Sequence, residues 1–126
     1  MPIIKPVRNI HPQISEDCFV AENATIVGEV TMGSQCSIWF NAVVRGDVHY
    51  IKMGNKVNIQ DGAVIHTTYQ KSPTTIGNNV SIATNTIISN NINKNSIVYN
   101  PYFFKNNSLK IKKNINSKKI KKILNK

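Results

Sequence analysis

Aliphatic residues recur every six positions along the first two thirds of the chain. The first run consists of Ile14, Val20, Ile26, Met32, Ile38 and Val44. An interruption around residues 49–52 follows, and the spacing resumes at Met53, Ile59 and Ile65 and again, after a loop at 67–75, at Ile76, Ile82 and Ile88. An amphipathic helix would repeat every three and four residues instead. The pattern therefore predicts short strands separated by regular turns.

A six-residue period predicts a particular solenoid. If the chain turns a corner every six residues and closes after three sides, each coil is a triangle of eighteen residues whose aliphatic side chains point inward. Successive coils then lie about 4.8 Å apart, the spacing of strands in any sheet. Cys18 and Cys36 are eighteen residues apart. We therefore expect them to stack as small core residues rather than to form a disulfide or a reactive thiol pair.

The same periodicity aligns polar residues in vertical stacks. We label the sides of each coil a, b and c from Ile14 onward, so that Arg45, His66 and Ser89 each follow the first aliphatic residue of side c in successive coils. These three residues should form one stack. Asp61 and Thr84 occupy equivalent places after side b and should form a second stack at a different edge. In a trimer, one such edge could face the other edge of a neighbouring subunit.

Two segments around these stacks carry a family resemblance. VVRGDVHYIKMGNKVNIQDGAVIHTT (43–68) and TTIGNNVSIATNTIIS (74–89) resemble the γ-class carbonic anhydrases, and the similarity extends over about residues 10–89. The resemblance implies an all-β, left-handed parallel β-helix of hexapeptide repeats that assembles as a homotrimer. It also implies a zinc or iron ion at the subunit interface, held by two histidines of one subunit and one of its neighbour.

Carried over by position, the resemblance assigns roles to six residues. His66 corresponds to the first metal ligand, whereas the other two ligand positions hold Thr84 and Ser89, which are not expected to bind the metal. Gln60 corresponds to the glutamine that orients the metal-bound hydroxide. The pair Arg45 and Asp61 corresponds to the interface pair of the family. Hydration of CO2 by zinc requires three protein ligands and a bound water. We therefore expect metal binding to be weak or absent and activity to be lost or reduced.

Other interpretations of these residues stay open. The chain could be an acyltransferase-like hexapeptide enzyme with His49 as its base, or a scaffold subunit in a mixed trimer with a complete homologue. Without partner ligands, His66 could be a plain surface or interface histidine. For Asp47 we expect hydrogen bonds to main-chain N–H groups of its turn, and for Trp39 packing at an interface.

Charge divides the chain into two parts. Residues 1–104 hold seven Lys and Arg against six acids, whereas 105–126 hold nine Lys and no acid, which gives most of the formal charge of +10. We therefore place the repeat domain at 1–100 and a basic tail at 101–126, with a short C-terminal helix over 108–124. Such a tail could touch nucleic acid through charge, but it lacks aromatic residues for base stacking among its lysines. We accordingly expect no nucleic-acid partner.

Two further features concern location and the end of the repeat. The start, MPIIKPVRNIHPQ, lacks a long apolar stretch, and no run of eighteen apolar residues occurs. This predicts a cytoplasmic protein without membrane contact. Only four residues separate Ile88 from Ile92, and SIVYNP (96–101) resembles the turn that ends the family's β-helix. We therefore expect the repeat to weaken after residue 90, with some coils absent.

Overall fold

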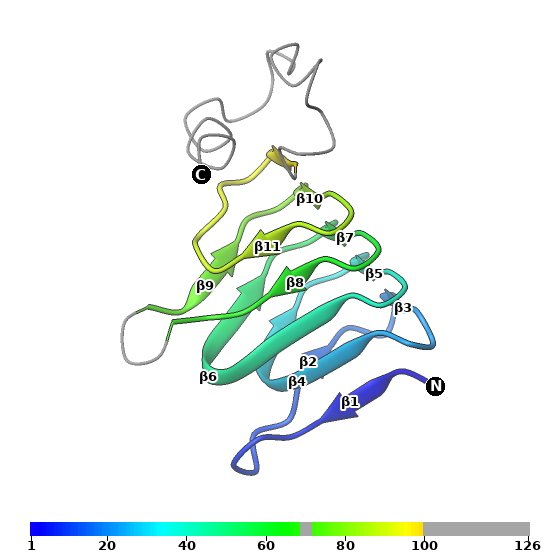
Figure 1. Ribbon diagram of the computed structural model, residues 1–126, viewed down its shortest axis with the longest axis vertical. Helices are drawn as coiled ribbons and strands as arrows, with labels where there is room; N and C mark the ends of the chain where they lie inside the picture. Colours follow the sequence, from blue (N-terminus) through cyan, green and yellow to red (C-terminus); the bar gives the residue numbers. More distant parts are fainter. Residues whose placement is uncertain (69–71, 100–126) are drawn as a thin grey trace.

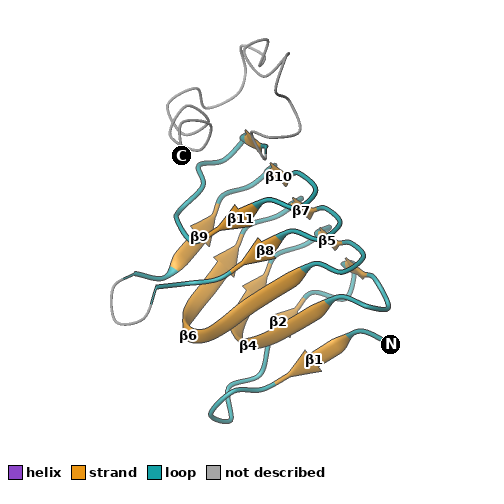
Figure 2. Cartoon of the chain, in the orientation of Figure 1, coloured by secondary structure: helices purple, strands orange, loops and turns teal. Residues whose placement is uncertain are grey.

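The computed structural model describes residues 1–68 and 72–99, and these form a parallel β-solenoid (Figures 1 and 2). The chain winds upward from the N-terminus in stacked coils, and every pairing between its strands is parallel. All regular elements of the described residues are strands. The prediction of an all-β, parallel β-helix is confirmed. The predicted C-terminal helix and the tail at 101–126 lie outside the described residues.

Three sides make up each coil, as the periodicity predicts. Side b is a five-stranded sheet in the spatial order β3 (Phe19–Val20), β5 (Ser37–Ile38), β7 (Asn58–Ile59), β10 (Ser81–Ile82) and β12 (Ile97–Val98). Sides a and c share the other sheet, because two strands run around the corner between them. These strands are β4 (Thr25–Met32) and β6 (Val43–Met53).

The remaining strands extend sides a and c. On side a, β2 (Gln13–Ile14) pairs with the end of β4, and β9 (Thr74–Ile76) pairs with the end of β6. On side c lie β1 (Ile3–Lys5), the beginnings of β4 and β6, β8 (Val64–Ile65) and β11 (Ile87–Ile88). The in-register pairs place each aliphatic residue directly above its counterpart in the coil below.

The core consists of three inward columns of these aliphatic side chains. Ile38, Ile59 and Ile82 on side b are fully buried, as are Val44 and Ile65 on side c. Burying one such side chain contributes about 1.5–3 kcal/mol. The hydrophobic effect along the columns and the hydrogen bonds between coils therefore stabilise the same stacked arrangement.

The corner between sides b and c is built from residues that accept a left-handed backbone. Asn41, Gly62 and Asn85 stack there with φ of 62°, 70° and 57°, a region that asparagine and glycine visit with little strain. Asn41 also exchanges hydrogen bonds with Asn23 in the coil below: its main-chain N–H donates to Asn23 Oδ1 at 3.0 Å, and Asn23 Nδ2 donates to its Oδ1 at 2.8 Å. These bonds hold the corners in register.

Both cysteines lie where the stacking argument places them. The pairing of Phe19 with Ser37 puts Cys18 and Cys36 at equivalent positions of successive coils. Both are free thiols, and each donates to a main-chain carbonyl, Cys18 to Gly33 at 3.1 Å and Cys36 to Gly54 at 3.2 Å. Burial raises the pKa of the Cys36 thiol above its ordinary value. A raised pKa lowers the thiolate fraction and so the reactivity.

The interruption around residues 49–52 is not a separate loop. It lies within the eleven-residue strand β6, which contains His49. The pairing between β4 and β6 slips here: Gly28 pairs with Gly46, but Val30 pairs with Ile51. The extra residues of β6 therefore bulge at the corner between sides c and a, and regular pairing resumes beyond them.

The repeat also continues beyond residue 90 in space. Ile92 pairs with Ile76, and Val98 pairs with Ile82. The coil thus contains a shortened third corner between Ile88 and Ile92. Ile97 and Val98 form β12, a further rung of side b, where we had expected the terminal turn to begin. No helix among the described residues is long and apolar enough to cross a membrane.

Substitution of one column residue tests this core. Ile59→Ala should lower the free energy of unfolding by about 2–5 kcal/mol, because the cavity would lie among well-packed neighbours above and below. Ile10→Ala is the matched control, since Ile10 is 40% exposed. Urea unfolding followed by circular dichroism measures both. Equal shifts of the midpoint in the two variants would contradict the column arrangement.

Candidate functional site

The first predicted stack lies on side c. Val44 pairs with Ile65, and Ile65 pairs with Ile88. The residues that follow them, Arg45, His66 and Ser89, are therefore neighbours in successive coils, and the main-chain N–H of His66 donates to Ile88 O at 2.9 Å. The structure thus places His66 one coil above Arg45 and one coil below Ser89.

Arg45 pairs with Asp47 of the same strand. Its Nη2 and Nε donate to Asp47 Oδ2 at 2.8 and 3.3 Å. Desolvation by burial raises the pKa of the Asp47 carboxyl, but the Arg45 hydrogen bonds and charge outweigh it and leave that pKa below its usual value. The Arg45 side chain is 50% exposed. An ion pair this exposed contributes little stability, so Arg45 can still contact a further group.

Asp47 was expected to bond main-chain N–H groups of its turn. The structure adds a guanidinium partner that the sequence argument missed, although the N–H groups of Asp47 and Val48 also lower the pKa of the carboxyl. The carbonyl of Asp47 in turn accepts a hydrogen bond from Arg8 Nη2 at 2.8 Å. Two arginines thus hold the bulge of β6.

His66 is oriented by the residues around the following loop. Its Nδ1 lies 3.1 Å from Thr67 O, an acceptor that requires Nδ1 to carry the hydrogen. Thr74 Oγ1, fully buried, donates to His66 O at 2.9 Å. In a neutral ring, the contact with Thr67 O favours the tautomer with an unprotonated Nε2, the arrangement that outer hydrogen bonds give to metal-binding histidines. Sequence reasoning missed Thr67 and Thr74, because the six-residue spacing does not indicate hydrogen bonds of individual residues.

His49 has the opposite arrangement. Its Nδ1 accepts a hydrogen bond from the main-chain N–H of Tyr50 at 3.0 Å, so the hydrogen of the neutral ring lies on Nε2. Its ring also packs edge-to-face on Tyr50, with the centroids 5.2 Å apart. In this conformation Nε2 is a donor and cannot accept a proton from a substrate.

The second predicted stack lies at the corner between sides b and c. Ile59 pairs with Ile82, and the main-chain N–H of Gln60 donates to Ile82 O at 2.9 Å, which places Asp61 and Thr84 at equivalent positions. Asp61 and Thr84 are exposed. Thr84 begins the turn into side c, whereas Ser89 lies at the far end of that side. Within one chain, the two stacks therefore remain at different edges.

Exposed aromatic side chains lie next to this second edge. Phe19 and Trp39 contact each other on side b with centroids 4.8 Å apart, and Phe40 lies 6.5 Å from Trp39. All three are more than a third exposed. Phe40 is one coil below Asp61 in the same vertical stack. The edge thus combines apolar area with a carboxylate.

The residues that the resemblance assigns to the three ligand positions do not fit a zinc site of the carbonic anhydrase type. One imidazole, from His66, is accompanied by the hydroxyls of Thr84 and Ser89, which are neutral and poor zinc ligands. Across residues 1–68 and 72–99, no three His, Cys, Asp or Glu side chains converge in a way that could hold a metal ion. We therefore derive no metal-dependent step from this chain.

Fold and stacks together define the class: the described residues form a hexapeptide-repeat β-helix with one histidine in an outward column. No protein-family model matches the chain. Individual relatives do. The chain is 38% identical over 97 residues to a carbonic anhydrase of Geobacillus kaustophilus, a match that covers 76% of this chain and 53% of that protein. It is 42% identical over 85 residues to an uncharacterized transferase, YtoA, of Bacillus subtilis, covering 64% and 50%.

A solved structure agrees with these relatives. The hexapeptide transferase family protein from Anaplasma phagocytophilum superposes with a TM-score of 0.61 at 28% identity, covering 77% of this chain and 68% of that one. These similarities support a γ-carbonic-anhydrase-like family of hexapeptide-repeat proteins for this chain. It spans about half the length of the curated relatives it matches.

The two histidine tautomers can be observed directly. At alkaline pH, where imidazoles are neutral, ¹⁵N NMR of the ring nitrogens should find His66 protonated on Nδ1 and His49 on Nε2. Thr74→Val should broaden or shift the His66 signals and leave those of His49 unchanged, since only His66 accepts from Thr74. Identical tautomers for both rings would contradict the assigned hydrogen bonds.

Proposed function

We propose that this protein is a subunit of a γ-carbonic-anhydrase-like homotrimer that has kept the family's scaffold and interface but has lost most or all CO2 hydration. The observation that carries the proposal is the identity of the residues at three aligned positions. His66 is present, whereas Thr84 and Ser89 replace the other two imidazoles. With zinc or iron bound weakly or not at all, no metal would lower the pKa of a water to near neutrality.

The outer surface of side c supports self-association. Val43 and Val64 are partly exposed there, and Ile87, above them in the same column, is 69% exposed. Beside this column lies half-exposed Arg45, and the adjacent edge carries exposed Asp61. An apolar strip flanked by opposite charges suits a second copy, whose Asp61 would meet Arg45. Such an ion pair would set the register of the interface more than its strength.

Gln60 would keep its place in this arrangement. It lies beside Asp61, one coil above Trp39, and its main chain is hydrogen-bonded to Ile82 in the coil above. In the proposed trimer its amide would face the remnant of the ligand cluster. Without three ligands, the glutamine has no metal-bound hydroxide to orient, so we assign it a positional role only.

A mixed trimer extends the same proposal. His66 of this chain, held with an unprotonated Nε2, could complete a donor set only with imidazoles from other copies. A complete homologue beside this chain would supply an imidazole at the position equivalent to 84, whereas Ser89 of this chain would stay in the stack of His66. This chain would then act as a scaffold subunit. The two free thiols are compatible with a cytoplasmic location.

The alternative function is that of an acyltransferase-like enzyme, which the description of several relatives as transferases favours. His49 would be its base. The hydrogen bond from Tyr50 N–H occupies Nδ1 of this ring, so His49 would have to rotate before Nε2 could act as a base. We therefore rank this alternative second. If the protein transfers an acetyl group from acetyl-CoA and His49→Ala abolishes this transfer, the acyltransferase function would rank first.

The interface pair is testable by a double-mutant cycle. Arg45→Ala and Asp61→Ala should each weaken trimer association by at least about tenfold, because each leaves an unpaired charge in the interface. The double variant should weaken it no further than either single change. Sedimentation velocity over a concentration series measures the assembly, and Arg8→Ala is the control. A monomeric wild-type protein, or fully additive effects, would contradict the interface.

Restoring the missing imidazoles tests the lost site. Thr84→His with Ser89→His should produce zinc binding near one ion per subunit and measurable CO2 hydration, because three imidazoles would then be available around each interface. Either change alone should recover much less. Metal analysis after dialysis and stopped-flow hydration assays provide the readouts. A trimeric double variant that binds no zinc would show that the positions are misaligned.

A further inference from the structure

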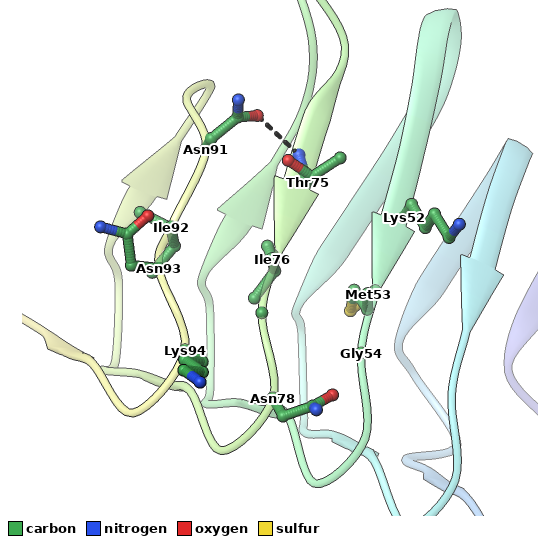
Figure 3. Close-up of a pocket in the computed structure, with 11 residues that line it drawn as sticks. Lys52, Met53, Gly54, Thr75, Ile76, Asn78, Asn91, Ile92, Asn93 and Lys94 are labelled. Carbon is green, nitrogen blue, oxygen red and sulfur yellow. Dashed lines mark hydrogen bonds between the residues drawn. The ribbon is translucent and has the colours of Figure 1, made fainter.

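A groove of about 490 Å³ lies on side a, on a different side of the coil from the His66 stack (Figure 3). It runs across the outer surface of three successive rungs. Its walls include Lys52, Asn78, Asn91 and Lys94, and its floor includes Gly54 and Gly77. The volume is within the range of small-molecule sites. Nothing in the proposed function uses it.

Gly54 and Gly77 leave no room for a side chain, because residues of the next coil approach them closely. A Cβ at Gly54 would overlap the Asn78 amide oxygen, and a Cβ at Gly77 would overlap the main chain of Lys94. The Asn78 oxygen accepts a hydrogen bond from the N–H of Asn55 at 2.7 Å. The close approach of the next coil therefore requires glycine at these two positions.

The same hydrogen bonds decide which amide atoms a ligand would meet. Asn78 uses its Oδ1 on the N–H of Asn55, and Asn91 uses its Oδ1 on the N–H of Thr75 at 2.8 Å. Figure 3 shows the Asn91 oxygen turned toward Thr75 and its nitrogen turned away. The NH2 groups remain as donors. The side-chain amides of Asn78 and Asn91 can therefore offer a ligand their NH2 groups but not their bonded oxygens.

Charge adds to this donor character. Lys52 and Lys94 are exposed and lie on opposite sides of the groove (Figure 3). Lys52 is two rungs below Asn91, roughly 10 Å at the spacing of adjacent strands. None of the described residues that line the groove is acidic. Two lysines and two asparagine amides thus line the groove, which suits a ligand that carries negative charge at more than one point.

We propose that the groove binds a small molecule with two linked phosphate groups, its oxygens accepting from Lys52, Lys94 and the amide groups of Asn78 and Asn91. Phosphate oxygens accept only, which suits a wall that presents donors. A single carboxylate would offer fewer acceptors than two phosphate groups. The site is independent of metal binding, so its occupancy does not depend on the state of His66.

Pyrophosphate is the probe for this site. The full-length ¹⁵N-labelled protein is titrated at constant pH and ionic strength, and the side-chain NH2 signals of Asn78 and Asn91 are followed together with the amides of Gly54 and Gly77. These signals should shift and saturate together. Lys52→Gln with Lys94→Gln should weaken the Kd read from them at least about tenfold, since two charged donors are lost. Lys5→Gln, an equal charge change per residue on β1, should leave it within a factor of two.

Parallel titrations with adenosine diphosphate separate an inorganic from an organic diphosphate ligand. Tighter binding than pyrophosphate would indicate that the remaining groove volume holds the organic group, and equal binding would assign the site to the diphosphate alone. Two results would overturn the proposal. One is a shift confined to residues of the lysine-rich segment 105–126. The other is equal weakening by Lys5→Gln and by the paired substitution when spectra show both variants folded.

Discussion

In-register stacking of parallel rungs is the constraint on which the rest of this structure depends. Each coil hydrogen-bonds to the coils above and below it, and a register slip of one residue would turn the aliphatic columns outward. Ile38, Ile59 and Ile82 therefore fix the vertical position of every outward residue on their side. The outward stacks, including Arg45, His66 and Ser89, are consequences of packing that occurs inside the coil.

Because inward and outward positions are separate, the residues at the proposed ligand positions can differ while the fold persists. Thr84 is exposed and Ser89 partly so, and neither belongs to an aliphatic column. Replacing imidazoles there removes ligands without opening a cavity. The buried positions around them, Ile82 and Ile88, remain aliphatic. A scaffold of this kind can be retained for assembly after its chemistry has been lost, which is the function we propose.

Periodicity alone predicted the three columns, the stacked cysteines and both polar stacks, because a solenoid converts sequence spacing directly into spatial neighbours. It failed where spacing is broken. The place of His49 within β6 depends on a bulge opposite Gly28, and the rung at Ile92 depends on a shortened corner that a fixed count of six cannot detect.

Periodicity also could not predict the hydrogen bonds of individual side chains. The pairing of Arg45 with Asp47 and the hold of Thr74 on His66 arise from corner geometry that the sequence pattern does not encode. The groove on side a was likewise missed. Its hydrogen-bond donors are available because main-chain N–H groups bind the side-chain oxygens of Asn78 and Asn91, and the sequence does not show this.

The central claim is that this chain assembles like its family while lacking the family's metal centre. Native mass spectrometry of the unmodified full-length protein, purified without chelator and then supplied with excess zinc, examines both parts in one spectrum. We predict a mass corresponding to three chains with no stoichiometric zinc. A trimer that carries one zinc ion per subunit would contradict the account, because three ligands would then have to come from residues other than Thr84 and Ser89.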